Sequence, residues 1–208
     1  MNQNIPFIPK QTTGKQVDLD YKVEADNPAT AKTIFTIARD YLLQPGLWHQ
    51  LAGAATATFS LATPGKSLNQ LILQEGDYIN IDIPGPGSKL GDGLDWTQVK
   101  AISENVCPGC DESYGVTLTA SSNPENDSQE TAHFFDHISS SSFVLQRIGN
   151  QVAISYHGRN EVPNRHTQSA ADNVRNTLVA AGAAAGLSEL QWTALLKGLL
   201  DTAVNDAA

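Results

Sequence analysis

Hydrophobic and polar residues alternate along several short segments of the chain, and this period of two is typical of β-strands. In the segment 77–83, Ile79, Ile81 and Ile83 would point to one face and the residues between them to the other. Prolines and glycines at 84–87 end this run, because proline donates no ladder hydrogen bond and glycine adopts unusual dihedrals. Further strands are predicted for the alternating runs 17–23, 114–119, 143–148 and 151–157.

The turn between the last two of these runs is Gly149-Asn150, a dipeptide that suits the positive φ of a tight hairpin turn. Earlier in the chain, Asn27 and Pro28 are a typical helix cap and first helical residue. They precede an amphipathic pattern that predicts a helix as far as Leu42.

The last forty residues change to a helical period, and Gly186 separates two predicted helices. The first has a stripe of mostly small residues, namely Ala171, Val174, Leu178, Ala181 and Ala185. In the second, large apolar residues cover about half of the circumference, wider than the ~100° stripe of an ordinary surface helix. We therefore expect that last helix to be buried on two sides, by its own domain or by a second copy of the chain. Its apolar residues are Leu190, Trp192, Leu195, Leu196, Leu199, Leu200 and Ala203.

These elements predict an α+β fold. The sheet would be strongly bent and antiparallel, or closed into a small SH3-like barrel, with an N-terminal helix and a C-terminal helical pair. We expect an extended arm over residues 1–15, the sheet or barrel body over 16–164, and the helical pair packed on it over 165–208.

Charge narrows the range of partners. The 208 residues carry a formal net charge of −9 and contain no basic run, so neither a nucleic acid nor an anionic membrane surface is expected to bind. No apolar stretch approaches membrane-spanning length, and residues 1–15 lack the pattern of a secretory signal. The expectation is a soluble cytoplasmic protein without a cofactor. A homo-oligomer formed through the last helix is the one partner that the pattern favours.

The segment 156–164, with the sequence YHGRNEVPN, has the densest chemistry. Arg159 could bind a carboxylate or phosphate, and His157 or Glu161 could move a proton. A structural interpretation is also open, because Arg and Glu at the end of a strand commonly pair and Asn often forms a turn. The ligand-binding candidates are Tyr156, His157, Arg159, Asn160, Glu161 and His133.

Cys107 and Cys110 form a C-x-x-C motif, which could be half of a zinc site or a redox pair. His133 and His137 have an H-x-x-x-H spacing, but the gap between the two pairs is longer than in a zinc finger. A redox motif would need a strand before it and a helix after it, and neither is predicted. The structural alternative is a Pro-Gly turn with two incidental thiols, and we expect no bound metal.

Four phrases, GDYINIDIPGPG, DGLDW, TAHFF and YHGRNEVPN, resemble phrases in a family of uncharacterised, soluble bacterial proteins of unknown function. The resemblance covers roughly the central half of the chain, leaves out CPGC, and implies neither a site nor a substrate. The first two phrases also resemble the first hairpin of an SH3-like barrel, which is an analogy of fold alone.

Three functional hypotheses follow. The first is a non-enzymatic binding or assembly protein. The second is a small-molecule-binding protein or hydrolase-like enzyme with a pocket around His157, Arg159 and Glu161, and the third is a zinc-stabilised module using Cys107 and Cys110. A deep pocket at His157 and Arg159 would favour the second hypothesis, whereas a flat surface there would favour the first.

Overall fold

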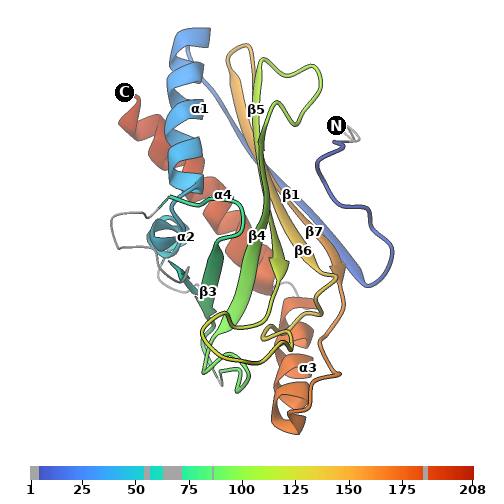
Figure 1. The fold of residues 1–208 in the computed structure, drawn as a ribbon. Coiled ribbons are helices and arrows are strands. Elements are labelled where there is room, and N and C mark those ends of the chain that lie inside the picture. The colour runs from blue at the N-terminus through green and yellow to red at the C-terminus, as the bar shows by residue number, and fades with distance from the viewer. Residues whose placement is uncertain (1–4, 54–56, 63–71, 86, 185–186) are drawn as a thin grey trace.

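The computed structural model describes residues 5–53, 57–62, 72–85, 87–184 and 187–208. These residues form a curled antiparallel sheet with helices against one face (Figure 1). In chain order the elements are β1 (Lys15–Glu24), α1 (Pro28–Leu42), the 3₁₀-helix η1 (Pro45–Leu47), α2 (Trp48–Ala52), β2 (Thr58–Leu61), β3 (Tyr78–Asp82), β4 (Asp95–Glu104), β5 (Glu112–Ala120), β6 (Ser140–Ile148), β7 (Gln151–Glu161), α3 (Ala170–Ala184) and α4 (Leu187–Asp206).

The sheet has seven strands in the order β1-β7-β6-β5-β4-β3-β2, and every neighbouring pair is antiparallel. The α+β prediction is confirmed, and the strongly bent sheet, rather than the closed barrel, is the form that the chain adopts. The β6–β7 hairpin turns at the predicted dipeptide, where Ile148 pairs with Gln151 and Gly149 has a φ of 58°. The first strand pairs with the last, and the two edges of the sheet are β1 and β2, which are separated in the sequence by α1, η1 and α2.

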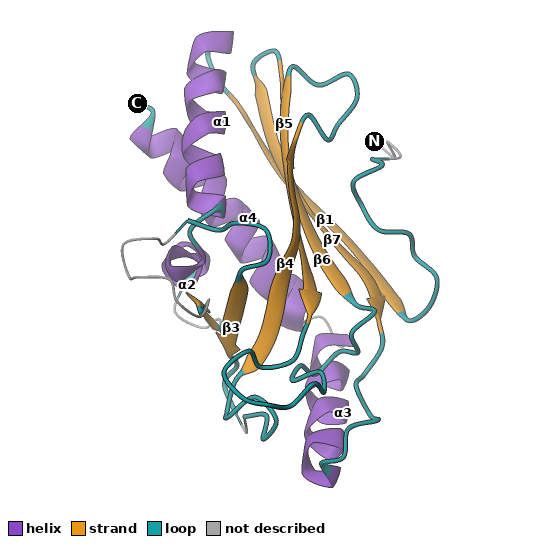
Figure 2. Cartoon of the chain, viewed as in Figure 1, coloured by secondary structure: helices purple, strands orange, loops and turns teal. Residues whose placement is uncertain are grey.

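Helices α1, α2 and α4 lie on the concave face of the sheet, and α4 runs diagonally across it (Figure 2). The predicted start of α1 is confirmed, since the Asn27 side chain accepts a hydrogen bond from Thr30 N–H at 2.9 Å and Pro28 is the first helical residue. Inward-pointing residues of the strands and the apolar side of α1 meet α4 in one core. Its largest fully buried members on this face include Trp48, Phe143, Tyr156, Ile79, Ile154 and Leu42.

Helix α4 is buried on two sides by its own chain, because the sheet covers one side and α1 and α2 cover the other. Leu195, Leu196, Leu199 and Leu200 are all fully buried, while Leu190 at the start of the helix is 70 % exposed. Of the two ways to cover this helix, the chain therefore uses its own elements for the leucine-rich part.

The N-terminal arm lies against the convex face of the sheet. Phe7 packs over Gly115, where a Cβ atom would lie 2.5 Å from the Phe7 ring, and Ile5 packs with Val106 and Val144. Asn160 fixes the other end of the arm, since its side-chain oxygen accepts hydrogen bonds from Thr12 and Thr13 and its side-chain nitrogen donates to the carbonyl of Lys10.

A matched pair of substitutions in α4 tests this packing. Leu199→Ala is expected to lower the free energy of unfolding by ~2–5 kcal/mol, because it removes a buried side chain and leaves a cavity. Leu190→Ala, in the same helix, should change it by less than ~0.5 kcal/mol, because that side chain is largely in water. Urea unfolding of both variants measures the difference, and equal losses would show that α4 does not have the packing described.

Candidate functional site

A bulge at the end of β7 decides where the predicted site residues point. Val152, Ile154 and Tyr156 alternate toward the core, but Asn160 has a φ of 56° and the β1–β7 register shifts opposite it, between Lys15 and Val17. Glu161 is thereby turned to the concave side, whereas His157 and Arg159 remain on the convex side. The cluster predicted from the sequence is therefore divided between the two faces of the sheet.

On the convex face, His157 is the centre of a hydrogen-bonded chain. Its Nε2 lies 2.9 Å from Ser155 Oγ and its Nδ1 lies 2.6 Å from Asp18 Oδ1. Arg159 donates to the same Asp18 oxygen at 2.6 Å and to the carbonyl of Val17 at 3.0 Å. Burial lowers the pKa of His157 despite the neighbouring carboxylate. Burial alone would raise the pKa of Asp18, but its hydrogen bonds from Gln16, His157 and Arg159 outweigh burial and lower it.

This Ser155–His157–Asp18 chain has the connectivity of a nucleophile, a base and an orienting acid, but not the setting of a catalytic site. Strand β7 is paired on both sides, with β1 and with β6, so its backbone N–H groups are used in the ladders and do not form an oxyanion hole. Neither cavity at the α3 end of the sheet is lined by His157 or Arg159. The geometry is that of a cross-strand polar network on a sheet surface.

On the concave side, Glu161 is 7 % exposed and folds back over Gly158, where an added Cβ would lie 2.3 Å from Glu161 Oε1. Its other oxygen, Oε2, is buried and has no hydrogen-bond partner among the described residues. Burial raises the pKa of Glu161 to about 7, with Lys15 opposing this shift and Glu189 adding to it. Burial also raises the pKa of Tyr156, whose hydroxyl lies 3.0 Å from Ser141 Oγ.

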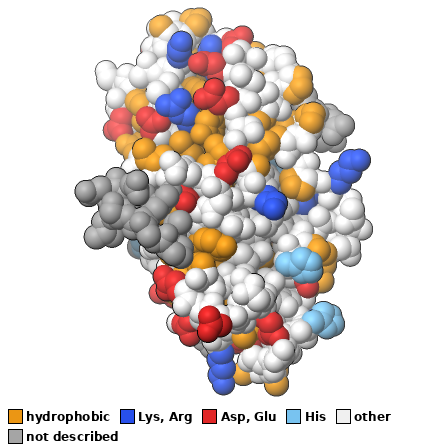
Figure 3. Space-filling view, viewed as in Figure 1, with side chains coloured by type: hydrophobic (Ala, Val, Ile, Leu, Met, Phe, Trp, Pro, Cys, Tyr) orange, Lys and Arg blue, Asp and Glu red, His pale blue; other side chains and the backbone are white. Residues whose placement is uncertain are grey.

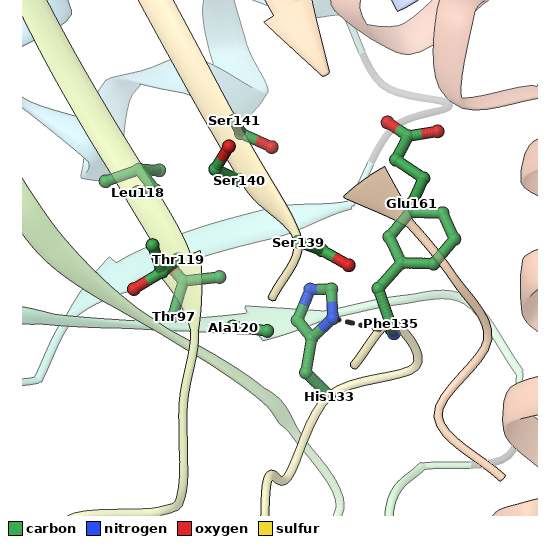
Figure 4. A pocket seen from close by; sticks show the side chains of 10 residues that line it. All are labelled: Thr97, Leu118, Thr119, Ala120, His133, Phe135, Ser139, Ser140, Ser141 and Glu161. Carbon is green, nitrogen blue, oxygen red and sulfur yellow. Dashed lines mark hydrogen bonds between the residues drawn. The ribbon is translucent and has the colours of Figure 1, made fainter. Parts of the chain in front are cut away.

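His133 lies near this end of the sheet and is buried. Its Nδ1 accepts a hydrogen bond from the Phe135 N–H at 2.9 Å, and burial lowers the pKa of the ring. The imidazole is therefore neutral, with its proton on Nε2. Figure 4 shows the ring pointing toward Ser139, Ser140 and Ser141, which lie at and just before the start of β6.

His133 and Glu161 line a small cavity of about 20 Å³, together with the three serines. The hydroxyl of Ser140 is buried here and, among the described residues, has no hydrogen-bond partner. A volume of this size admits about one water molecule. It has no room for a ligand.

A larger, open cleft adjoins this cavity, and both are lined by Ala120. The cleft has a volume of about 550 Å³, within the ~300–1,000 Å³ range of small-molecule sites. It lies between the loop from β5 to β6 and the connector from β7 to α3. Apart from Ala120 it is lined by polar residues, namely Ser121, Ser122, Gln129, Glu130, Thr131, Asp136, His137, Asn164, His166 and Thr167.

Buried polar contacts fix the walls of this cleft. Arg175 of α3 forms a two-pronged ion pair with Asp95 at the start of β4, and Asp95 also accepts from Phe134 N–H at 2.9 Å. Asn164 donates to the carbonyls of Thr131 and His133 at 2.9 and 3.1 Å, so it ties the connector to the β5–β6 loop.

The C-x-x-C motif lies in the loop between β4 and β5, and Cys107 and Cys110 are joined by a disulfide. The interpretation as two incidental thiols is therefore wrong, and disulfide-bonded sulfurs are not the thiolates that a zinc site requires. The loop has a strand on each side, rather than the helix that would follow a redox motif. His133 is buried, while His137 is exposed and lies 2.6 Å from Asp136, so the two histidines do not face a common site. In the described part of the chain, no three His, Cys, Asp or Glu side chains are placed to hold one metal ion.

None of the described helices has the length and apolar character needed to cross a membrane. No protein-family model matches the sequence, and no curated protein matches it. Several solved structures are similar to the chain.

The protein TTHA0849 from Thermus thermophilus is 12% identical, with 93% of this chain and 100% of that chain covered and a TM-score of 0.48. A protein from Arthrobacter aurescens solved by NMR is 12% identical over 90% of this chain and 86% of its own, with a TM-score of 0.42. Ara h 8.0201 is 8% identical over 92% and 99%, with a TM-score of 0.34. These values describe a general likeness of fold, from which no function follows.

Several site residues are not evident from the sequence. Asp18 and His157 are 139 positions apart in the sequence, and the pairing of β1 with β7 brings them together. Asp95 and Arg175 are 80 positions apart. No local pattern marks either pair. The segment 121–130 is rich in polar and turn-forming residues, which is typical of a loop, but its place in a cleft depends on the connector beyond β7.

The raised pKa of Glu161 predicts how stability depends on pH. Because the folded-state pKa of about 7 exceeds the ordinary 4.5, folding takes up a proton between these values. The protonated carboxyl therefore contributes about 3 kcal/mol to the free energy of unfolding below pH 4.5, and this contribution is lost as the pH rises through 7. Glu161→Gln should remove this part of the pH dependence, measured as urea unfolding from pH 5 to 8, whereas the exposed Glu104→Gln should retain it. If the free energy of unfolding of Glu161→Gln changes with pH as steeply as that of the wild type, the carboxyl is already ionised in the folded protein.

Proposed function

We propose that this protein is a non-enzymatic binding protein that holds a small, uncharged, hydroxyl-rich molecule in the open cleft. The observation that carries the proposal is the lining of the cleft: hydroxyl, amide, imidazole and carboxylate groups around about 550 Å³, with no Lys or Arg among the lining residues. Such groups both donate and accept hydrogen bonds, as a polyol or saccharide does.

The charge of the cleft supports an uncharged ligand over an anion. The lining contains two carboxyl groups, Glu130 and Asp136, and no Lys or Arg, so a phosphate or carboxylate would meet like charge without a Lys or Arg to compensate it. Both carboxylates already accept hydrogen bonds, Glu130 from Gln168 N–H at 3.1 Å and Asp136 from Ile138 N–H at 3.3 Å. On the face seen in Figure 3, Lys and Arg side chains stand singly or beside acidic ones.

The packing of the concave side supports a site outside the core. The space between the sheet and α4 contains an aromatic cluster in which the ring centroids of Trp48, Phe143, Tyr156 and Trp192 lie 4.9–5.5 Å from a neighbour. Rings at these distances are in van der Waals contact. The cleft, in contrast, is open, and its walls are fixed by buried hydrogen bonds.

The hydrolase-like alternative has less support. It would use the Ser155–His157–Asp18 chain, which has the required order of groups but lies on a surface without free backbone N–H donors from β7. The absence of His157 and Arg159 from the lining of both cavities favours a binding protein.

Saturation-transfer difference NMR with glucose and maltose tests the proposal, with glucuronate as the anionic counterpart of glucose. We expect signals from the two uncharged saccharides and a signal from glucuronate at least several-fold weaker, because the cleft has no Lys or Arg to receive its carboxylate. His166→Ala should reduce the saccharide signals, since the side chain is exposed and lines the cleft.

His49→Ala, in α2, is the matched control and should leave the signals unchanged. Equal signals in His166→Ala and His49→Ala would remove the cleft as the site. Stronger binding of glucuronate than of glucose would contradict the ligand class.

A further inference from the structure

Helix α3 is attached to the body by its polar side. Asp172, Arg175 and Asn176 are buried: Asp172 accepts from the N–H groups of Lys89 and Leu90 at 2.8 and 3.0 Å, Arg175 pairs with Asp95, and Asn176 donates to the Asn164 carbonyl at 3.0 Å. The helix stands at the end of the sheet, apart from α1 and α2 (Figure 2).

Its apolar side consequently faces solvent. Val174 is 64 % exposed and Leu178 is 69 % exposed, and Ala171 and Ala181 are exposed on the same face. The sequence pattern predicts this stripe, and in the structure it lies on the solvent side of the helix. Ala185, the last member predicted, lies outside the described residues. A soluble surface seldom leaves large apolar side chains side by side without a partner.

The stripe is symmetric along the helix. An antiparallel copy of α3, related by a twofold axis at the level of Asn176, places Val174 against Leu178 of the other chain and Ala171 against Ala181. The large residues then fill the centre, and the alanines at both ends allow the helices to approach closely. An interface in which residue i meets j and j meets i is what a twofold dimer requires.

The distribution of charge also favours a second copy of this chain as the partner of α3. The only charged residues of α3 are Asp172 and Arg175, and both are buried, so the exposed side of the helix carries no charge. Two copies of a chain with a net charge of −9 repel each other over most of their surface. At the uncharged outer face of α3, two copies can come into contact without placing like charges together. A charged partner would have no opposite charge on this face with which to form an ion pair.

We propose that the outer face of α3, formed by Ala171, Val174, Leu178 and Ala181, is a homodimer interface in which two copies of the helix pack antiparallel about a twofold axis. A fifteen-residue helix is ~22 Å long, and a single helix pair buries less than the ~800 Å² per partner of a standard interface. The dimer is therefore weak, with a dissociation constant on the order of 0.1 mM.

Sedimentation equilibrium of the full chain between about 20 µM and 1 mM tests this. The average mass should rise from the monomer value of 22.2 kDa toward twice that value across the range. Leu178→Lys should keep the monomer mass throughout, because it places a charge at the centre of the pair. Since this change makes the protein less negative, a lost dimer could not be attributed to greater overall repulsion.

Ile148→Lys, at the 45 % exposed isoleucine that ends β6, is the matched control and should associate as the wild type does. Far-UV circular dichroism checks that each variant is folded, and Val174→Lys replaces Leu178→Lys if the latter is not. A wild-type monomer up to 1 mM would overturn the proposal, and so would a dimer that persists in the folded α3 variant.

Discussion

The buried ion pair between Asp95 and Arg175 determines how the α3 end of the molecule is built. Both side chains are removed from water, and Arg175 donates to both oxygens of Asp95. Breaking such a pair from one side typically costs ~3–5 kcal/mol, because it leaves an uncompensated buried charge. The pair joins the first residue of β4 to α3, and through Phe134 N–H it also holds the β5–β6 loop. The cleft and the outward apolar face of α3 both depend on this contact.

A second local feature, the bulge at Asn160, separates the two ends of β7 into different environments. One residue with positive φ turns Glu161 inward, while its side chain holds the N-terminal arm on the opposite face. The same residue thus makes Glu161 a buried carboxyl with a raised pKa and leaves His157 and Arg159 in a network with Asp18 on the convex surface. Proximity in the sequence is a poor guide to proximity in space wherever a bulge reverses the alternation of a strand.

The elements that the sequence predicts well are those determined by local pattern. The alternation in β3, the Gly149-Asn150 turn and the Asn27 cap of α1 are examples, because side-chain period, positive φ and capping are properties of a few neighbouring residues. The leucines of α4 were also predicted to be buried on two sides. The orientation of α3 was not predicted, because its periodicity defines a stripe without saying which side meets the body. The side of α3 that meets the body is determined by its contacts with Asp95 and Asn164. Asp95 lies 80 positions before Arg175 in the sequence, and Asn164 lies in the connector before α3. The sequence does not predict the cleft for the same reason: the β5–β6 loop and the β7–α3 connector line it, and no pattern in either segment identifies the other.

The structure thus has a filled concave side and an open polar cleft beyond the end of the sheet, and our central claim is that ligands bind in the cleft. Two-dimensional ¹H–¹⁵N NMR of the protein titrated with maltose tests it most directly. The predicted result is that shifts are confined to residues 121–131, 136–137 and 164–167, while the indole N–H signals of Trp48 and Trp192 stay in place. Shifts of those two indole signals, with the cleft residues unaffected, would contradict the claim and place the site between the sheet and α4.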